Sequence, residues 1–251
     1  MSGAAALASA PGFTERGFDL LERIDYRRAD SKQEREAIYR LRYQAYLREG
    51  AIAPNALKEL SDRYDDMPNA WTFGIYIDEK LASSIRVCVG SPTHPLTPAT
   101  NVFSDVLLPE VGSGKTLIDP NRFVTDPEAT QAFPELPYLT VRLGFVACEY
   151  FKTDIGAATP RLEHEAFYKR VFRMNVTAPA RTFPTLTKPH SLMSVHYPSV
   201  REKILWRYPF FRSTFFERRM LFERAYVPLQ AANDYRPMAD APAMPVLGMM
   251  S

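Results

Sequence analysis

Two short segments with alternating apolar residues, 71–78 and 81–89, constrain the fold of this chain most. The polar sequence Asp78-Glu79-Lys80 separates them, and alternation with a period of two is typical of a β-strand. Two such strands joined by a short polar turn predict a β-hairpin. The side chains expected on its inner face are Phe73, Ile75, Ile77, Ile85, Val87 and Val89, with Ser84, Arg86 and Cys88 on the other face.

Helical and strand-like segments follow one another along the rest of the chain. Ser31 and Glu34 form the S-x-x-E pattern of a helix capping box, and an apolar stripe runs on from Ile38 to Tyr46. A hairpin combined with strand–helix units predicts an α/β fold with a mixed sheet. The helices are expected over 31–48, from about 138 to 151 and from Pro160 to about 172, and the further strands over 117–124, 154–159, 176–186 and 192–197.

The chain is expected to form one domain over residues 13–227, because no linker interrupts residues 31–225. Residues 1–12 are small and low in complexity, and we expect them to be a flexible leader instead of a signal peptide. Residues 228–251 are rich in Pro, Ala and Met, which predicts a flexible tail.

Composition excludes several classes of protein. A net charge of +2 over 251 residues indicates no particular partner. Cys88 and Cys148 belong to no disulfide framework, which favours a reducing, cytoplasmic location. The four His residues have no ligand spacing, so we expect no metal site, and no apolar run has the length of a membrane span. The sequence Gly114-Lys115-Thr116 resembles the end of a P-loop, but Pro109 occupies the position of its first Gly.

Several charged residues lie within apolar or ordered-looking segments. Such charges are costly unless they are paired, so the pattern indicates either an active site or a structural ion network. Asp119 and Arg122 would face opposite sides of a regular strand; a bulge would bring them together, and Pro120 disfavours a regular ladder there. Taken singly, the acids 62 and 65 fit a solvated loop and the Arg at 86 fits the solvent face of a strand. The full set is Arg42, Asp62, Asp65, Arg86, Asp119 and Arg122.

In order and spacing, these residues resemble the acyl-homoserine-lactone synthases and, more closely, the long-chain N-acyl amino acid synthases of the FeeM type. Both belong to the GNAT-like acyltransferase superfamily. The resemblance spans roughly residues 30–225. It is carried by Tyr39–Tyr46 with its Arg42, by Asp62 and Asp65, by Arg86 in Ser84–Val87, by the acid-x-x-Arg strand Ile118–Phe123, and by the helix-like block His164–Phe172.

The resemblance implies a GNAT-like acyl-CoA N-acyltransferase fold: a mixed twisted sheet flanked by helices, with a bulged central strand. Lactone synthases usually carry Glu where Asp119 stands, and favour a Trp where this chain has Ala51 and Ile52. These departures favour the amino acid synthase. Residues 125–137 hold no Gly to cradle the pyrophosphate of coenzyme A, which favours a carrier-protein thioester as the donor.

The implied reaction is transfer of a long-chain fatty acyl group from acyl carrier protein to the amine of an amino acid, without a cofactor. The implied catalytic residues are Asp119, Arg122 and Tyr168. Asp119 would accept the proton of the amine or, as an equal alternative, would anchor Arg122. Tyr168 would protonate the departing thiolate, unless it is an ordinary core residue. Arg42, Asp62, Asp65 and Arg86 would bind the amino acid or order the surrounding loop.

Two further surfaces are expected from composition. An acyl-chain pocket would be lined by Val141, Phe145, Phe151, Phe167 and Phe172, which are equally ordinary core residues. Residues 201–224 interleave aromatic and basic side chains, which suits an acidic carrier protein, a membrane surface or single-stranded nucleic acid, and equally an amphipathic packing segment. The docking residues expected for a carrier protein are Arg201, Lys203, Arg207, Arg212, Arg218 and Arg219.

Three functions of other kinds fit parts of the sequence. They are lactone signal synthesis from S-adenosylmethionine, a non-catalytic acyl-carrier or membrane-binding module, and nucleic-acid binding through residues 201–224. We expect acyl carrier protein and an amino acid as partners, with peripheral membrane contact as an option and no nucleic acid.

Overall fold

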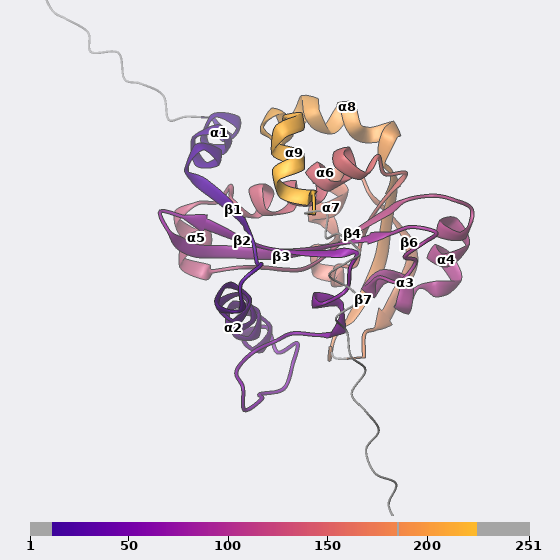
Figure 1. Ribbon diagram of the computed structural model, residues 1–251, viewed down its shortest axis with the longest axis horizontal. Coiled ribbons are helices and arrows are strands. Elements are labelled where there is room, and N and C mark those ends of the chain that lie inside the picture. Colours follow the sequence, from indigo (N-terminus) through magenta and orange to yellow (C-terminus); the bar gives the residue numbers. More distant parts are fainter. Residues whose placement is uncertain (1–11, 185, 225–251) are drawn as a thin grey trace, which may run out of the picture.

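The computed structural model describes residues 12–184 and 186–224. The expected tail and nearly all of the expected leader lie outside these residues. Within them, seven strands form one mixed sheet in the order β1-β2-β3-β4-β5-β7-β6 (Figure 1). Only the β4–β5 pair is parallel. The strands are β1 Ile24–Arg28, β2 Ala70–Ile77, β3 Lys80–Gly90, β4 Leu117–Thr125, β5 Ile155–Ala158, β6 Asn175–Thr182 and β7 Pro189–His196.

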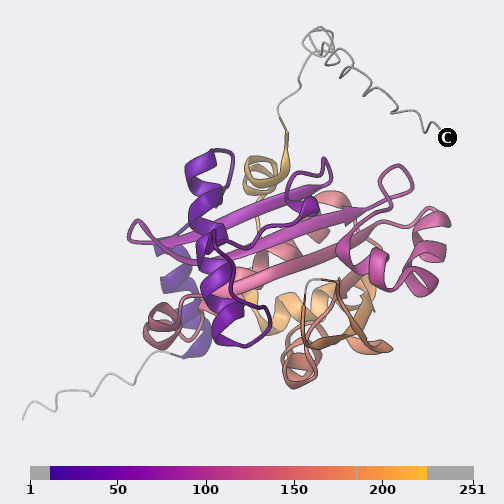
Figure 2. The same cartoon turned by 90° about the horizontal axis from the view of Figure 1, so that it is seen from below.

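Helices cover both faces of the sheet. In Figure 1, α6, α8 and α9 lie above it with α1, and α2 lies below it; Figure 2 shows α2 lying across the strands from the other side. We call these the α6 face and the α2 face. The α-helices are α1 Phe13–Arg23, α2 Lys32–Arg48, α3 Pro98–Val102, α4 Ser104–Gly112, α5 Pro127–Ala132, α6 Leu136–Phe151, α7 Glu165–Phe172, α8 Tyr197–Arg207 and α9 Phe215–Phe222, with 3-10 turns η1 Arg63–Asp65, η2 Leu162–His164 and η3 Pro209–Phe211.

The helix expected over 31–48 is confirmed together with its cap. The Ser31 hydroxyl accepts a hydrogen bond from the Glu34 backbone N–H at 3.2 Å, and the Ser31 N–H donates to the Glu34 carboxylate at 3.0 Å. This exchange satisfies two of the backbone donors that a helix start leaves without partners. Ile38 and Ala45 on the apolar stripe are buried, and so is Arg42.

The β2–β3 hairpin is also confirmed, with Ile77 opposite Lys80. Asp78 and Glu79 turn the chain with positive φ angles of 49° and 65°. One expectation for this hairpin was wrong. The Arg86 side of β3 is not solvated, because α2 covers it, and Arg86 itself has no exposed surface.

β4 carries the bulge expected in the central strand. Ser84 pairs with Val124, but Arg86 pairs with Asn121, so β4 holds one more residue than β3 across this interval. Arg122 lies in the bulge and has a left-handed φ of +53°. An extra residue in one strand turns side chains that would alternate to the same side.

β4 and β5 pair over a short length only. Their register comprises Leu117 with Ile155 and Ile118 with Gly156, after which β4 continues along β3 while β5 pairs with β7 on its other side. Because the two parallel strands separate beyond these pairs, the space between them can hold side chains or a ligand.

The remaining expected elements are found with shifted bounds. The helix expected to start at Pro160 begins at Glu165, because a 3-10 turn from Leu162 to His164 precedes it. The late strands are β6 and β7, and residues 201–224 form most of α8, then η3 and α9. Within the described ranges, no helix combines the length and the apolar character of a membrane span.

Candidate active site

Five of the charged side chains singled out in the sequence meet on the α2 face. Arg42 donates to Asp65 at 2.7 Å, and Arg122 donates to Asp62 at 2.6 Å. Arg86 donates to Asp62 at 2.7 Å and lies 3.0 Å from Asp65. We call Arg42, Asp62, Asp65, Arg86 and Arg122 the ion cluster. The pairing expected for these residues is therefore present.

Backbone contacts fix the two carboxylates of this cluster. Asp62 caps the 3-10 turn that follows it by accepting the Tyr64 N–H at 2.9 Å, and the Asp62 N–H donates to Asp65 at 3.0 Å. Thr72 on β2 donates to the same Asp65 carboxylate at 3.3 Å. Both acids therefore lie in a turn that hydrogen bonds hold against the sheet, and the interpretation of them as solvated loop residues is wrong.

Because these side chains are buried, the ionisation of each one depends strongly on its charged neighbours. The Arg42 and Arg86 side chains are at most 1% exposed, and Asp62 is 15% exposed. Burial alone would raise the pKa of the Asp62 carboxyl, but the hydrogen bond from Arg86 and the charges of Arg86 and Arg122 outweigh it and hold that pKa well below its usual range. Burial likewise opposes ionisation of Asp65, and the charges of Arg42 and Arg86 lower its pKa nonetheless.

The ion cluster holds one more cation than anions, since three guanidinium groups face two ionised carboxylates. Arg42 shows where the charge is least compensated. Its Nε and Nη2 are buried and have no hydrogen-bond partner among the described residues, and burial lowers its pKa. Buried donors without a partner are costly, and they are common where a ligand or water completes a site.

Asp119, the sixth residue of the set, is fully buried next to α3. Its Oδ2 accepts the Ala99 N–H at 2.9 Å, whereas its Oδ1 has no hydrogen-bond partner within the described part of the chain. Burial raises the pKa of this carboxyl. Arg122 pairs with Asp62 at 2.6 Å, so among the described residues an acid other than Asp119 anchors it.

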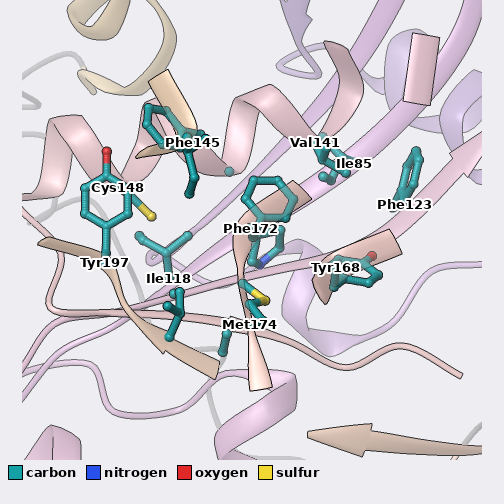
Figure 3. A pocket seen from close by; sticks show the side chains of 16 residues that line it. Ile85, Ile118, Phe123, Val141, Phe145, Cys148, Tyr168, Phe172, Met174 and Tyr197 are labelled. Carbon is teal, nitrogen blue, oxygen red and sulfur yellow. The ribbon is translucent and has the colours of Figure 1, made fainter. Parts of the chain in front are cut away.

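An apolar cavity lies on the other face of β4, where β4 and β5 separate. The residues around it surround about 520 Å³ of space, part of which is open solvent. Figure 3 shows Phe123 and Tyr168 at one end and Cys148 and Tyr197 at the other. Its wall includes Ile118, Pro120 and Phe123 from β4, Val141, Phe145 and Cys148 from α6, Tyr168 and Phe172 from α7, and Tyr197 and Ile204 from α8.

The two ends of this cavity differ in exposure. Phe123 and Tyr168 are half-buried, whereas Tyr197 and Ile204 are 6% and 2% exposed. The mouth therefore lies between β4 and α7, and α8 closes the far end. Burial raises the pKa of the Tyr168 hydroxyl, so this group keeps its proton at neutral pH.

Tyr46 lies between the cavity mouth and the ion cluster, and no role beyond the apolar stripe was expected for it. The Arg122 guanidinium lies 5.3 Å from the centre of the Tyr46 ring. Tyr46 also contributes to the raised pKa of Tyr168, next to the cavity mouth. Its position one turn after Arg42 on the apolar stripe is the signal that marks it.

Some residues expected in the pocket lie elsewhere. Val141, Phe145 and Phe172 line the cavity. Phe167 packs instead against the Tyr138 ring at 5.3 Å, and Phe151 packs against Trp71 at 5.1 Å. Both are on the expected helices, but they point away from the cavity.

The basic residues expected to dock a carrier protein are not equally available. Arg201 is paired with Glu149 at 2.6 Å, and Arg219 with Glu223 at 2.7 Å. Arg218 donates to the Ser213 carbonyl at 2.8 Å. Across residues 12–184 and 186–224, Lys203, Arg207 and Arg212 are exposed and make no ion pair. No group of three His, Cys, Asp or Glu side chains in these ranges is arranged to hold a metal ion.

The arrangement brings an apolar slot and a buried charged cluster to opposite faces of one bulged strand. The family model described as N-acyl amino acid synthase FeeM matches residues 37–196, which contain the ion cluster and all of the cavity wall except Tyr197 and Ile204. The chain belongs to the FeeM family of N-acyl amino acid synthases. It is therefore an acyltransferase, and an amino acid is the acyl acceptor that this family implies.

Solved structures agree with this membership at the level of fold. The structure of FeeM, an N-acyl amino acid synthase from uncultured soil microbes, superposes with a TM-score of 0.59 at 18% identity, covering 73% of this chain and 96% of that one. BjaI, a CoA-dependent acyl-homoserine lactone synthase, gives a TM-score of 0.51 at 12% identity, covering 74% and 89%. A search of curated protein sequences gives no match. The expected GNAT-like fold is confirmed.

Proposed function

We propose that this FeeM-family synthase transfers a long-chain fatty acyl group from acyl carrier protein to the α-amine of an amino acid. The observation that carries the proposal is the apolar cavity between β4 and β5, whose mouth adjoins the bulge at Arg122. A fatty chain in this slot would hold its thioester carbonyl beside the bulge, where the charged residues of the α2 face come closest.

The amino acid carboxylate would be bound by the uncompensated charge of the ion cluster. Three guanidinium groups against two carboxylates favour one more anion, and the free N–H groups of Arg42 supply donors for it. Arg122 is the cluster member nearest the cavity, because the next residue, Phe123, lines the mouth. The α-amine of the same molecule would then face the thioester.

Asp119 is our candidate for the group that accepts the amine proton, directly or through a water. One of its oxygens accepts the Ala99 N–H, and the other makes no hydrogen bond of normal geometry among the described residues, although the side chains of Thr97 and Asn121 lie near enough to lower the pKa of the carboxyl against the effect of burial. Its raised pKa makes it a stronger base than an exposed Asp. Tyr168 at the mouth would donate a hydrogen bond from its hydroxyl to the departing sulfur. Because burial raises the Tyr168 pKa, tyrosinate is a stronger base than the thiolate, so the hydroxyl stabilises the developing negative charge through a hydrogen bond and retains its proton.

A carrier protein would have to dock beside the cavity mouth, because its prosthetic thiol delivers the acyl chain there. α7 borders the mouth through Tyr168 and carries Lys169 and Arg170, and Arg173 follows it directly; all three basic residues are exposed, although Lys169 pairs with Glu165 at 3.0 Å. The segment 201–219, expected from the sequence to dock the carrier, adjoins the closed end at α8 instead. We therefore place the docking surface on α7, where basic side chains would meet an acidic carrier protein.

The test is a reconstituted reaction followed by mass spectrometry. Purified protein is incubated with acyl carrier protein loaded with chains of 8 to 16 carbons, and with the matching coenzyme A thioesters, in a mixture of the twenty amino acids. The proposal predicts N-acyl amino acids formed faster from the carrier thioester. Equal or faster turnover of coenzyme A thioesters would refute the carrier as donor, and no N-acyl amino acid from either donor would refute the transfer itself.

A further inference from the structure

The outer surface of α8 and α9 carries large apolar side chains that the acyltransferase reaction does not use. Trp206 is 81% exposed, Phe215 is 68%, Phe216 is 72% and Met220 is 66%. In Figure 1, α8 and α9 form the outer part of the helical layer above the sheet. We call Trp206, Phe215, Phe216 and Met220 the aromatic face. Exposed apolar residues gathered on one pair of helices indicate a binding surface.

The periodicity of both helices separates this face from the core. On α8, Val200, Ile204 and Leu205 are buried, whereas Lys203 and Trp206 lie three residues apart on the outer side. On α9, Leu221 and Phe222 are buried and the residues of the aromatic face point outward. Each helix therefore packs one apolar side against the core and exposes further apolar side chains on its outer side.

The charge around the aromatic face is positive. Residues 201–224 hold seven basic and three acidic residues, a difference of +4. The three acids are all engaged: Glu202 with Arg201, Glu217 with the buried Arg142, and Glu223 with Arg219. Of the other five basic residues, Arg218 and Arg224 donate to backbone carbonyls, whereas Lys203, Arg207 and Arg212 make no ion pair within the ranges described above.

Exposed aromatic side chains flanked by unpaired cations favour a bilayer surface with anionic lipids. Trp and Phe insert at the boundary of headgroups and acyl chains, while Lys and Arg contact the headgroups. An acidic carrier protein would use the cations but would leave the aromatic rings in water, and α8 lies at the closed end of the cavity. We propose that the aromatic face docks this enzyme on anionic membrane surfaces.

The purpose of this contact rests on the proposed function, because an N-acyl amino acid with a long chain partitions into lipid. The contact itself does not depend on catalysis. It can therefore be tested with inactive protein and without knowledge of the acyl donor.

The experiment is co-sedimentation of the full chain with vesicles. One set contains phosphatidylcholine alone and the other contains phosphatidylcholine with phosphatidylglycerol. Binding is expected to the anionic vesicles and to weaken at high salt. The double variant Trp206→Ser, Phe216→Ser is expected to lower the partition coefficient at least about tenfold, since it removes two apolar anchors. Lys203→Glu with Arg207→Glu is expected to lower binding to anionic vesicles only.

A matched control is provided by apolar side chains of similar exposure elsewhere. Leu57, in the loop after α2, is 81% exposed, and Leu162 is 59% exposed. The variant Leu57→Ser, Leu162→Ser should bind vesicles as the original chain does. Far-ultraviolet circular dichroism and turnover of soluble thioesters report whether each variant is folded.

Three results would overturn the proposal. The original chain would fail to sediment with anionic vesicles, or the control variant would lose as much binding as the aromatic one. In the third, the aromatic variant would sediment normally but lose binding to acyl carrier protein, which would make the face a protein dock. None of these results bears on whether acyl transfer occurs, so failure here is distinct from failure of the proposed function.

Discussion

Arg86 shows that the burial and ion pairing of a single residue depend on its tertiary contacts. Its position on an alternating strand fits a solvent-facing side chain, yet it is fully buried between β3 and α2 and bridges two carboxylates. Local pattern does not specify what will cover a strand. The signal that pointed to burial was collective: several charges recurred in apolar segments, and charges in such places need partners.

Replacement of Arg86 by Met should strongly destabilise the fold. It would leave Asp62 and Asp65 buried with fewer cations, and breaking a buried pair costs about 3–5 kcal/mol. Urea unfolding at pH 7 measures this. Arg27→Met is the control, because Arg27 pairs at the surface with Asp25 and Glu79, and such pairs contribute about 1 kcal/mol or less. Similar losses in the two variants would contradict a buried ion cluster.

The variant Asp119→Asn should abolish the base while preserving shape. Its amide oxygen still accepts the Ala99 N–H, so we expect the protein to fold and kcat to drop by about 10²–10⁴. Burial raises the pKa of Asp119, so the activity of the original enzyme should be lost as pH falls through that raised pKa, when the carboxylate gains a proton. The residual activity of the variant should not show this loss at low pH. An unchanged kcat would remove Asp119 from the mechanism.

At the scale of elements, the sequence predicted those whose pattern is local. The α2 helix has a capping box and an apolar stripe, and the β2–β3 hairpin has strict alternation, so both were expected with nearly correct bounds. The β1 strand was missed because Ile-Asp-Tyr-Arg-Arg is mostly polar, as an edge strand can be. The α4 helix was missed because it contains Pro109.

The cavity could not be delineated from the sequence, because its walls come from strands and helices far apart in the chain. Phe145 and Phe167 are equally apolar, and only packing decides that the first lines the slot and the second meets Tyr138. The bulge was foreseeable from Pro120, which disfavours a regular ladder, although Pro120 itself pairs with Val87 and the bulge follows it, between Asn121 and Val124.

Filling the closed end of the cavity should shorten the preferred acyl chain. Cys148→Phe adds a ring beside Tyr197, and each methylene that no longer fits loses about 0.8 kcal/mol, roughly fourfold in kcat/KM. Mass spectrometry of products from a mixture of chain lengths measures the shift. Phe151→Leu, on the same helix but outside the cavity, should leave the distribution as it is. Unchanged preference in the Cys148 variant would mean that the chain lies elsewhere.

At the scale of the whole molecule, the cavity mouth and the aromatic face lie at different places on the helical layer. Under the two proposals, α7 would meet the soluble donor and α8–α9 would meet a lipid surface. Composition alone indicated the second segment and not the first, because three basic residues on and just after a short helix are unremarkable until the mouth beside them is known.

Reversing the charges of α7 should weaken use of the carrier protein. The triple variant Lys169→Glu, Arg170→Glu, Arg173→Glu is expected to raise KM for acyl carrier protein thioesters at least about tenfold, because it turns attraction into repulsion. Its kcat with a short synthetic thioester should stay unchanged. Lys203→Glu with Arg207→Glu on α8 is the matched control and should keep the original KM. If only the α8 variant showed a raised KM, the docking surface would lie within residues 201–219 instead.

The brief pairing of β4 with β5 divides the sheet into two blocks, β1–β4 and β5–β7, that share two residue pairs of backbone. Elsewhere in the sheet a neighbouring strand fills such a gap; in the proposed reaction the hydrocarbon tail of the substrate would fill it here. The substrate would then be a temporary part of the protein interior, which each turnover removes again.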